Sequence, residues 1–313
     1  MLCEEEHMER LLRVATCLAE GGYGAQAGAL AATARALRAD AQLWAAQARH
    51  RGPIGRTALM HAARRGDASR ALFLLERGAD VEARTTVIGN TALLYACAAG
   101  HSEAARLLVE RGGANVNAAR PLNGYTLLMW AANNGHLEIV RFLVEHCGAS
   151  VNAGRTSDGL TALMRASASG HLETARFLVE RGGANVNAAR TTDGFSVLMY
   201  ASHAGHVGIV RLLLEHGAHV NAGKFTDGMT ALMWAAEEGH LEVVRCLLEH
   251  GANANATRDL CGYTPLMFAS RNGHAPVVRL LLQRGAIKRL TNHAGFTARR
   301  LAAGQPLVLA ELA

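Results

Sequence analysis

The chain contains little proline, few aromatic residues and no long apolar run. Five of its 313 residues are proline, and Phe, Trp and Tyr together make up 5%. A helix that crosses a membrane needs about 18 or more consecutive apolar residues, and no stretch approaches this length. We therefore expect no membrane partner. The combination of low proline with 33 glycines is typical of short, closely packed helices that end at glycine.

The six cysteines form no CxxC pair and have no regular spacing. Cys97 occupies a position that holds Ala or Ser in other parts of the chain, and Cys246 a position that holds Leu or Phe. This usage predicts buried thiols in a reducing compartment, without disulfides or metal ligands. Three acids follow Cys3 directly, which argues against a secretory or mitochondrial leader. The sequence thus predicts a cytoplasmic or nuclear protein.

A formal net charge of +6 and an isoelectric point near 9.3 favour acidic partners. Such a mild excess does not by itself indicate nucleic-acid binding.

The chain repeats itself with a period of 33 to 35 residues. Each repeat opens on a Thr or Ser anchor, at Thr57, Thr91, Thr126, Thr161, Ser196, Thr230, Thr264 and Thr297. A period of this size predicts a stacked solenoid, in which each repeat contacts only its neighbours and one long surface stays available. Solenoids of this kind are expected to bind other molecules rather than catalyse reactions.

Residues 126–160 illustrate the repeat. Leu127 to Asn134 predict a short helix that ends at Gly135, because glycine readily takes the left-handed conformation of a helix exit. His136 to His146 predict a second helix with apolar residues at helical spacing. The following segment carries turn residues, with Asp158-Gly159 as a hairpin signal.

These repeats resemble the ankyrin repeat family. The resemblance rests on the Gly-x-Thr-x-Leu opening, the Ala-Ala-x-x-Gly-His turn and the Val-x-x-Leu-Leu-x-x-Gly-Ala-x-Val-Asn tail, and it covers residues 53–313. It implies an all-α ankyrin-repeat solenoid of helix–turn–helix–hairpin units in a curved array, with seven full repeats. A truncated last unit from Thr297 predicts a C-terminal cap, with Pro306 beginning a final short helix.

Residues 1–52 do not fit the repeat. Glu4–Glu20 and Gln26–His50 predict two Ala-rich helices. Two interpretations stay open for them, an N-terminal cap on the first repeat or a separate short interaction segment.

The sequence departs from the family pattern at several places. The usual His after Thr-Pro-Leu is replaced by Leu94 or by methionine, as at Met129, and only Pro265 keeps the proline. The hairpin segment is one residue longer than the commonest form. Repeats two to four add a further residue, as in Gly112-Gly113, and this insertion puts the hairpin geometry in question.

A first variable position follows Leu-Met in the first helix. The family resemblance places it on the concave side, beside the hairpins. It would form an aromatic stripe with an arginine near its middle, and Trp, Tyr and Arg are enriched at binding hot spots. The alternative is that these rings only pack against neighbouring helices. The residues are His61, Tyr95, Trp130, Arg165, Tyr200, Trp234 and Phe268.

A second variable position is the pair before Gly-His, where the charge changes sign along the chain. Such a pattern suits a specific protein surface better than a uniform polyanion, although these residues could also be solvated helix ends. The candidates for partner contacts are Asn133, Asn134, His203, Glu237, Glu238 and Arg271. Together the two positions predict a non-enzymatic adaptor that binds a protein or peptide in the concave groove, and we expect it to be a monomer.

A third position forms a basic ladder in the hairpins. Its cations could follow phosphates or an acidic peptide, which keeps polyanion or nucleic-acid binding as an alternative function. Asp158, Asp193 and Asp227 stand three residues after a ladder cation, however, and favour local pairing. The ladder comprises Arg84, Arg120, Arg155, Arg190, Lys224 and Arg258.

No nucleophile motif, phosphate loop or special carboxylate pair occurs, so we expect no enzyme and no cofactor. Six histidines that follow the turn glycine lie about one repeat apart and cannot converge on one metal ion. The resemblance implies that each bonds within its turn. It also implies that the hairpin asparagines, such as Asn152 and Asn187, could be presented to an asparaginyl hydroxylase.

Overall fold

The computed structural model describes residue 32 and residues 54–313. It divides into two compact units, Met1–Leu122 and Asn123–Ala313, and each is described by itself. The two helices predicted before residue 51 and the predicted domain boundary at residues 52 and 53 lie outside the described residues.

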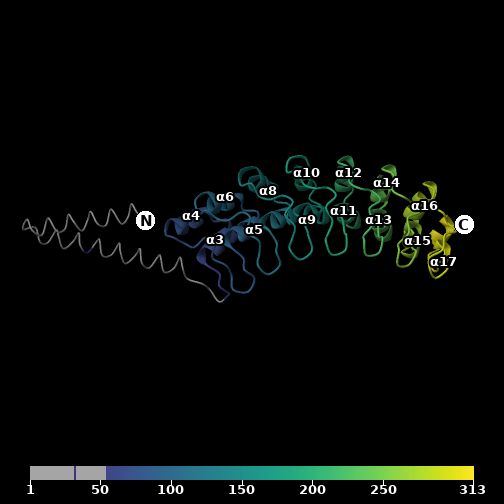
Figure 1. Ribbon diagram of the computed structural model, residues 1–313, viewed down its shortest axis with the longest axis horizontal. Coiled ribbons are helices and arrows are strands. Elements are labelled where there is room, and N and C mark those ends of the chain that lie inside the picture. The colour runs from purple at the N-terminus through teal and green to yellow at the C-terminus, as the bar shows by residue number, and fades with distance from the viewer. Residues whose placement is uncertain (1–31, 33–53) are drawn as a thin grey trace, which may run out of the picture. The chain divides into compact units, whose positions relative to one another are not determined.

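Two repeats are described in the first unit. Their helices are α3 (Ala58–Arg65), α4 (Ala68–Glu76), α5 (Ala92–Ala99) and α6 (Ser102–Glu110). The first helices α3 and α5 pack side by side, as do the second helices α4 and α6. The result is a two-layered stack, with the hairpin loops projecting from the layer of first helices (Figure 1).

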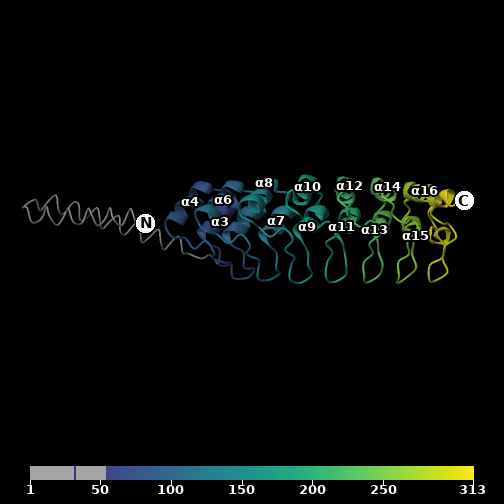
Figure 2. The ribbon, with the colours of Figure 1, turned by 45° about the horizontal axis from the view of Figure 1, so that its top comes forward.

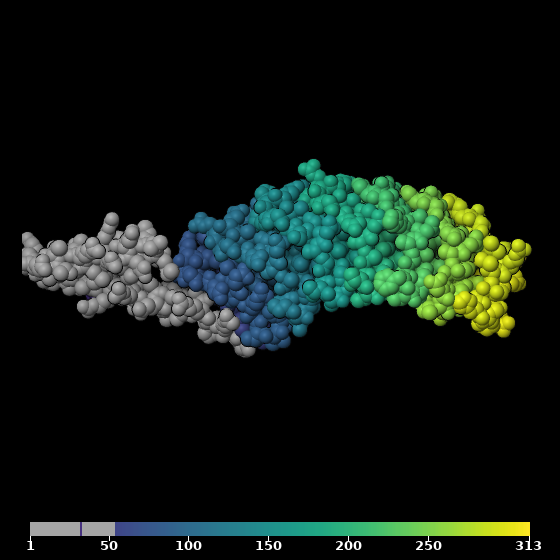
Figure 3. Space-filling view, viewed as in Figure 1, coloured from purple at the N-terminus to yellow at the C-terminus, as the bar shows by residue number. Residues whose placement is uncertain are grey.

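The second unit has a two-layered arrangement of the same kind (Figure 2). In chain order its elements are α7 (Leu127–Asn133), α8 (Leu137–Arg141), the π-helical turn η1 (Phe142–His146), α9 (Ala162–Ser169), α10 (Leu172–Glu180), α11 (Val197–His203), α12 (Val207–Glu215), α13 (Ala231–Glu238), α14 (Leu241–Glu249), α15 (Pro265–Arg271), α16 (Ala275–Gln283), α17 (Ala298–Leu301) and α18 (Pro306–Glu311). The space-filling view shows these repeats packed into a continuous surface (Figure 3). The predicted short final helix is confirmed as α18, with Pro306 in its first turn.

The Thr or Ser anchor begins each first helix by capping it. The Thr126 hydroxyl accepts a hydrogen bond from the backbone N–H of Met129 at 3.3 Å, and the other anchors make the equivalent bond. A cap satisfies a backbone donor that the helix cannot pair itself. At Ser196 the Met199 sulfur also accepts the anchor's own N–H at 3.4 Å. The methionine that replaces the family's histidine therefore contributes to this cap.

The core lies between the two helical layers of each unit. Met129 and Leu143 are fully buried in the second unit, and so are Leu59 and Leu108 in the first. Alanines such as Ala131 fill the tightest places, which lets the short helices approach closely. The periodic Leu, Met and Ala positions are thus the packing residues that the repeat pattern predicts.

The extra residue of the 35-residue repeats is accommodated at the end of the second helix. In repeats without it, the closing alanine bonds five residues back, as Ala218 N–H does to Leu213 O. In repeats with it the bond spans six residues, as from Ala184 N–H to Leu178 O. In the repeat that begins at Thr126 the helix predicted as continuous over 136–146 widens into η1, because the insertion is absorbed there. The hairpin therefore does not absorb the extra residue.

The hairpins are reverse turns rather than extended strands. The described residues form isolated bridges and no extended strands, as at Ala189–Ser196, Gly223–Thr230 and Thr291–Thr297. At the predicted Asp158-Gly159 turn, the Gly159 N–H bonds to Arg155 O at 2.7 Å, and Gly159 has a φ of 72°. The turn therefore needs glycine at one position, and the fold is all-α as predicted.

Candidate functional site

The first variable position is partly buried, and its members differ in exposure. In the first unit His61 is exposed and Tyr95 is buried. In the second unit Phe268 is buried in a cluster with Met229 and Met233. Tyr95 and Phe268 therefore serve packing, in accord with the packing interpretation. The members that are half-buried, and so able both to pack and to present a surface, are Trp130, Arg165, Tyr200 and Trp234.

A second column of aromatic residues lines the same face of the second unit, and sequence analysis missed it. Tyr125, Phe195 and Tyr263 each stand directly before an anchor. Their rings contact the variable residue five positions on, with centroids 5.4 Å apart for Tyr125 and Trp130 and 4.6 Å apart for Phe195 and Tyr200. The signal was present, because comparison of the positions before the anchors would have found this column.

Phe195, Tyr200, His203, Lys224 and Trp234 form what we term the aromatic cluster. Trp234 reaches back to the preceding repeat, with its ring centroid 5.5 Å from Phe195 and 4.9 Å from His203. Lys224 Nζ lies 5.8 Å and 6.0 Å from the Phe195 and Trp234 centroids, a distance at which a cation is attracted to a ring face. Rings at these separations stabilise one another beyond their buried area.

The Trp234 indole N–H is buried and finds no acceptor in the described part of the chain. A buried donor without a partner is energetically costly. An acceptor brought in by another molecule would remove this cost, which distinguishes Trp234 from a ring that only fills space.

Arg165 lies in the same layer, at the first helix of the repeat before Tyr200. Its guanidinium Nη2 donates to the Asn133 amide oxygen and its charge lies 5.9 Å from the Tyr125 ring centroid. Its buried Nε has no hydrogen-bond partner among the described residues. Asn133 also accepts from the Ser169 hydroxyl at 3.3 Å and donates to Asn134 at 3.0 Å. These two predicted contact residues are therefore already held in place.

Of the other predicted turn residues, His203, Glu237 and Glu238 lie near Trp234, and Arg271 lies one repeat further on. His203 Nδ1 is 3.5 Å from a Glu238 carboxylate oxygen. Glu237 is half-buried, and burial together with the neighbouring Glu238 raises the pKa of its carboxyl. Arg271 is exposed one repeat further on. The structure thus brings Trp234, His203, Glu237 and Glu238 together at the end of α13.

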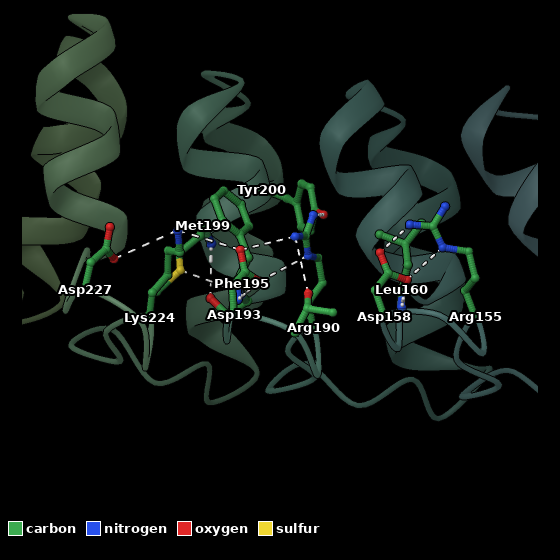
Figure 4. A network of polar contacts seen from close by, with 12 residues as sticks. Arg155, Asp158, Leu160, Arg190, Asp193, Phe195, Met199, Tyr200, Lys224 and Asp227 are labelled. Atoms are coloured by element: carbon green, nitrogen blue, oxygen red, sulfur yellow. Dashed lines mark hydrogen bonds and ion pairs between the residues drawn. The ribbon is translucent and has the colours of Figure 1, made fainter. Parts of the chain in front are cut away.

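The hairpin cations of the second unit are paired with aspartates (Figure 4). Arg155 makes two hydrogen bonds to Asp158, and Arg190 makes two to Asp193, at 3.1 and 3.2 Å. The Arg155 interaction holds the pKa of the Asp158 carboxyl below its usual value. The local pairing expected from the sequence is therefore confirmed for these residues.

Other ion pairs connect one hairpin to the next. Lys224 Nζ lies 3.7 Å from Asp193 and 3.9 Å from Asp227. Arg258 has Cys261 in place of an aspartate three residues on, and it bonds Asp227 of the preceding hairpin at 2.8 Å. Three successive hairpins are thus linked by one chain of alternating charges.

Four of the turn histidines, His101, His171, His240 and His274, bond through the ring to the preceding repeat and not within their own turn. His171 Nε2 lies 2.9 Å from Asn133 O, and His240 Nε2 lies 3.0 Å from His203 O. The resemblance implied a bond inside the turn, and this was wrong. The ring lies against the turn glycine of the earlier repeat, so that a Cβ on Gly135 would stand 2.4 Å from the His171 ring. These histidines fix the spacing of neighbouring repeats.

The hairpin asparagines also join consecutive repeats. Asn187 Nδ2 donates to Gly217 O at 3.1 Å, while its Oδ1 accepts from the His219 N–H at 2.8 Å. Asn152 and Asn221 make the equivalent pair of bonds, each to the repeat that follows it. Both ends of each amide are therefore used in stacking.

Among the described residues no three His, Cys, Asp or Glu side chains are grouped so that they could hold a metal ion. Over the same residues, none of the helices has the length and apolar character that crossing a bilayer requires.

Of the four described cysteines, Cys97 and Cys246 are buried as predicted, whereas Cys147 and Cys261 are only half-buried.

Helix pairs stacked in two layers, with inter-repeat histidines and a partly exposed aromatic face, define a helical-repeat protein of the solenoid class. Comparison with protein-family models identifies the family within this class. The family model for ankyrin repeats (3 copies) matches residues 25–120, 113–190, 152–224, 182–258 and 219–292. The chain therefore belongs to the ankyrin repeat family, whose members are generally protein–protein interaction modules. No curated protein matched the chain.

Proposed function

We propose that this protein is a non-enzymatic interaction module that binds a protein or extended peptide on the aromatic face of its second unit. The observation that carries the proposal is the aromatic cluster, where Trp234 is half-buried and its indole N–H has no acceptor in the described residues. Hot spots at protein interfaces are enriched in Trp, Tyr and Arg that lie in such partly dehydrated places. Trp130, Arg165, Tyr200 and Trp234 supply these residue types.

Trp234 and Tyr200 supply contact area, because each ring contacts Phe195 and each residue is only half-buried. Contacts with neighbouring rings hold these side chains in place, so little conformational entropy is lost on binding. His203, Glu237 and Glu238 border Trp234 and add polar contacts that select among partners.

Polyanion binding through the hairpin ladder is the competing function. It requires cations that are available to phosphates, whereas Arg155, Arg190, Lys224 and Arg258 all have carboxylates within 4 Å. This pairing favours the aromatic face.

The test is an affinity pull-down from lysate of the source cell, at low and moderate salt, followed by titration of the captured partner. We expect the Trp130→Ala, Trp234→Ala double variant to bind at least about 2 kcal/mol more weakly, as loss of hot-spot residues does. A matched control is the double variant Arg176→Ala, Arg245→Ala, on the exposed faces of α10 and α14.

Circular dichroism establishes that each variant is folded. Unchanged affinity in a folded Trp double variant would contradict the proposal. Nucleic acid recovered by all forms, and lost as salt rises, would instead support the hairpin ladder.

A further inference from the structure

The partly buried charges beside the aromatic cluster are compensated within the protein, with two exceptions of opposite sign. Arg190 and Lys224 are matched by Asp193 and Asp227. Arg165, one repeat before Tyr200, and Glu237, one repeat after it, make no ion pair in the described residues. The uncompensated charges therefore stand on the two sides of the cluster.

Arg165 is a partly dehydrated cation that lacks a counter-ion. Its only side-chain hydrogen bond among the described residues goes to the neutral amide of Asn133, and its buried Nε is without a partner. Guanidinium groups bind carboxylates through two parallel N–H donors. A carboxylate is thus the group that best completes this environment.

Glu237 is a partly buried carboxylate that lacks a counter-ion among the described residues. It is half-buried beside Glu238, and both circumstances disfavour its charged form. Arg258, Arg271 and His203 lie near enough to oppose this effect in part, but none of them makes an ion pair with it. Arg258 is bonded to Asp227, and His203 lies at Glu238. An incoming ammonium or guanidinium group would compensate two adjacent carboxylates at once.

The stacking of first helices sets the separation of these two charges. Arg165 is on α9 and Glu237 is on α13, with α11 packed between them. First helices in contact stand about 10 Å apart, a helix diameter, so two steps are about 20 Å. An extended chain advances about 3.3 Å per residue, so this distance corresponds to about six residues.

We propose that the partner is an extended segment carrying an acidic and a basic residue about six positions apart, the acid against Arg165 and the base against Glu237. Apolar residues between them contact Tyr200 and Trp234. This inference rests on the proposed function and adds to it the chemistry and the direction of the bound segment, because a segment lying the other way would place like charges together.

The probe is a display library of random 12-residue peptides, selected on the immobilised full-length chain. We expect enriched peptides to carry an acid and a base five to seven positions apart, in one consistent order. The charge-swapped variant Arg165→Glu, Glu237→Lys should enrich the opposite order. The outer-face variant Arg176→Glu, Glu242→Lys spans the same two repeats on α10 and α14 and should select the wild-type order.

Single enriched peptides give the quantitative test. Each should bind at least about tenfold more weakly to Arg165→Gln or to Glu237→Gln, since a charge-assisted contact contributes on the order of 1.5 kcal/mol or more. These milder variants decide the question if the charge-swapped protein does not fold. Thermal melting checks the fold of all variants.

Different outcomes contradict the charge pattern and the proposed function. Enriched peptides that need Trp130 and Trp234 but show no charge spacing would overturn this inference and leave the proposed function standing. Peptides that bind equally well to the Trp double variant, or a library with no enrichment, would overturn the proposed function as well.

Discussion

The Nε2 atom of His171 lies 2.9 Å from the backbone carbonyl oxygen of Asn133, so the start of α10 is bonded to the end of α7 in the preceding repeat. A carbonyl can only accept, which means that this nitrogen carries the proton. The same ring covers the turn at Gly135. A solenoid is stabilised by the interfaces between neighbouring repeats, and His171 contributes to one of them.

We expect His171→Ala to lower the free energy of unfolding by about 1–3 kcal/mol, because it leaves the Asn133 carbonyl with one partner fewer and removes the contact with Gly135. Urea unfolding followed by circular dichroism measures this loss. Glu173→Ala, two residues on and exposed, is the control and should change stability by less than about 0.5 kcal/mol. Equal losses in the two variants would mean that the histidine bond does not stabilise the interface.

The turn glycines allow the conformational role and the packing role of glycine to be separated. Gly239 and Gly251 have nearly equal φ values of 80° and 83°. A Cβ on Gly239 would stand 2.5 Å from the His274 ring, whereas a Cβ on Gly251 would meet no atom within 4 Å. Alanine at either place incurs the cost of the left-handed conformation, about 1–2 kcal/mol.

We therefore expect Gly239→Ala to destabilise the protein more than Gly251→Ala, by at least about 1 kcal/mol, because His274 must also move and lose its bond to Glu237 O. The measurement is the urea midpoint of each variant, compared at equal denaturant dependence of the unfolding free energy. If the two substitutions cost the same, backbone conformation alone would explain these glycines.

The repeat period was sufficient to predict the fold, because its Thr anchors, apolar spacing and turn glycines are all local signals. The helix predicted over 127–134 differs from α7 (Leu127–Asn133) by a single residue. The cap at α18 was predicted for the same reason, since Pro306 directs a helix start without any contact from elsewhere.

Contacts between repeats were harder to predict, because a period does not say which atoms of neighbouring units meet. The pairing of Phe195 with Trp234 depends on α13 packing beside α11, so that the Trp234 ring reaches the preceding repeat. The bond of His171 to the preceding repeat depends on the direction of the ring. The place of the inserted residue depends on whether helix or hairpin deforms more readily, and the six-residue bond at Ala184 shows that the helix end does.

The paired carboxylate of Asp158 gives a test by pH. Its Oδ1 accepts from Arg155 Nε at 2.7 Å and from the Leu160 N–H at 3.2 Å. The Arg155 bond is the main cause of the lowered pKa, with burial acting in the opposite direction. Because the folded pKa lies below the unfolded value near 3.8, the unfolded chain takes up the proton first as the pH falls. The stabilisation is complete above the unfolded pKa and is lost below it.

We expect Asp158→Asn to be less stable than wild type near pH 6, and the difference in urea midpoint to shrink as the pH falls below about 4, where the unfolded wild-type aspartate becomes protonated. Asp259→Asn is the control, because the exposed Asp259 carboxylate makes no ion pair in the described residues, and its midpoint should follow wild type at every pH. A difference for Asp158→Asn that stays constant from pH 6 to pH 3 would mean that the amide loses packing or geometry alone. The Arg155–Asp158 charge pair would then contribute nothing to the stability of its hairpin.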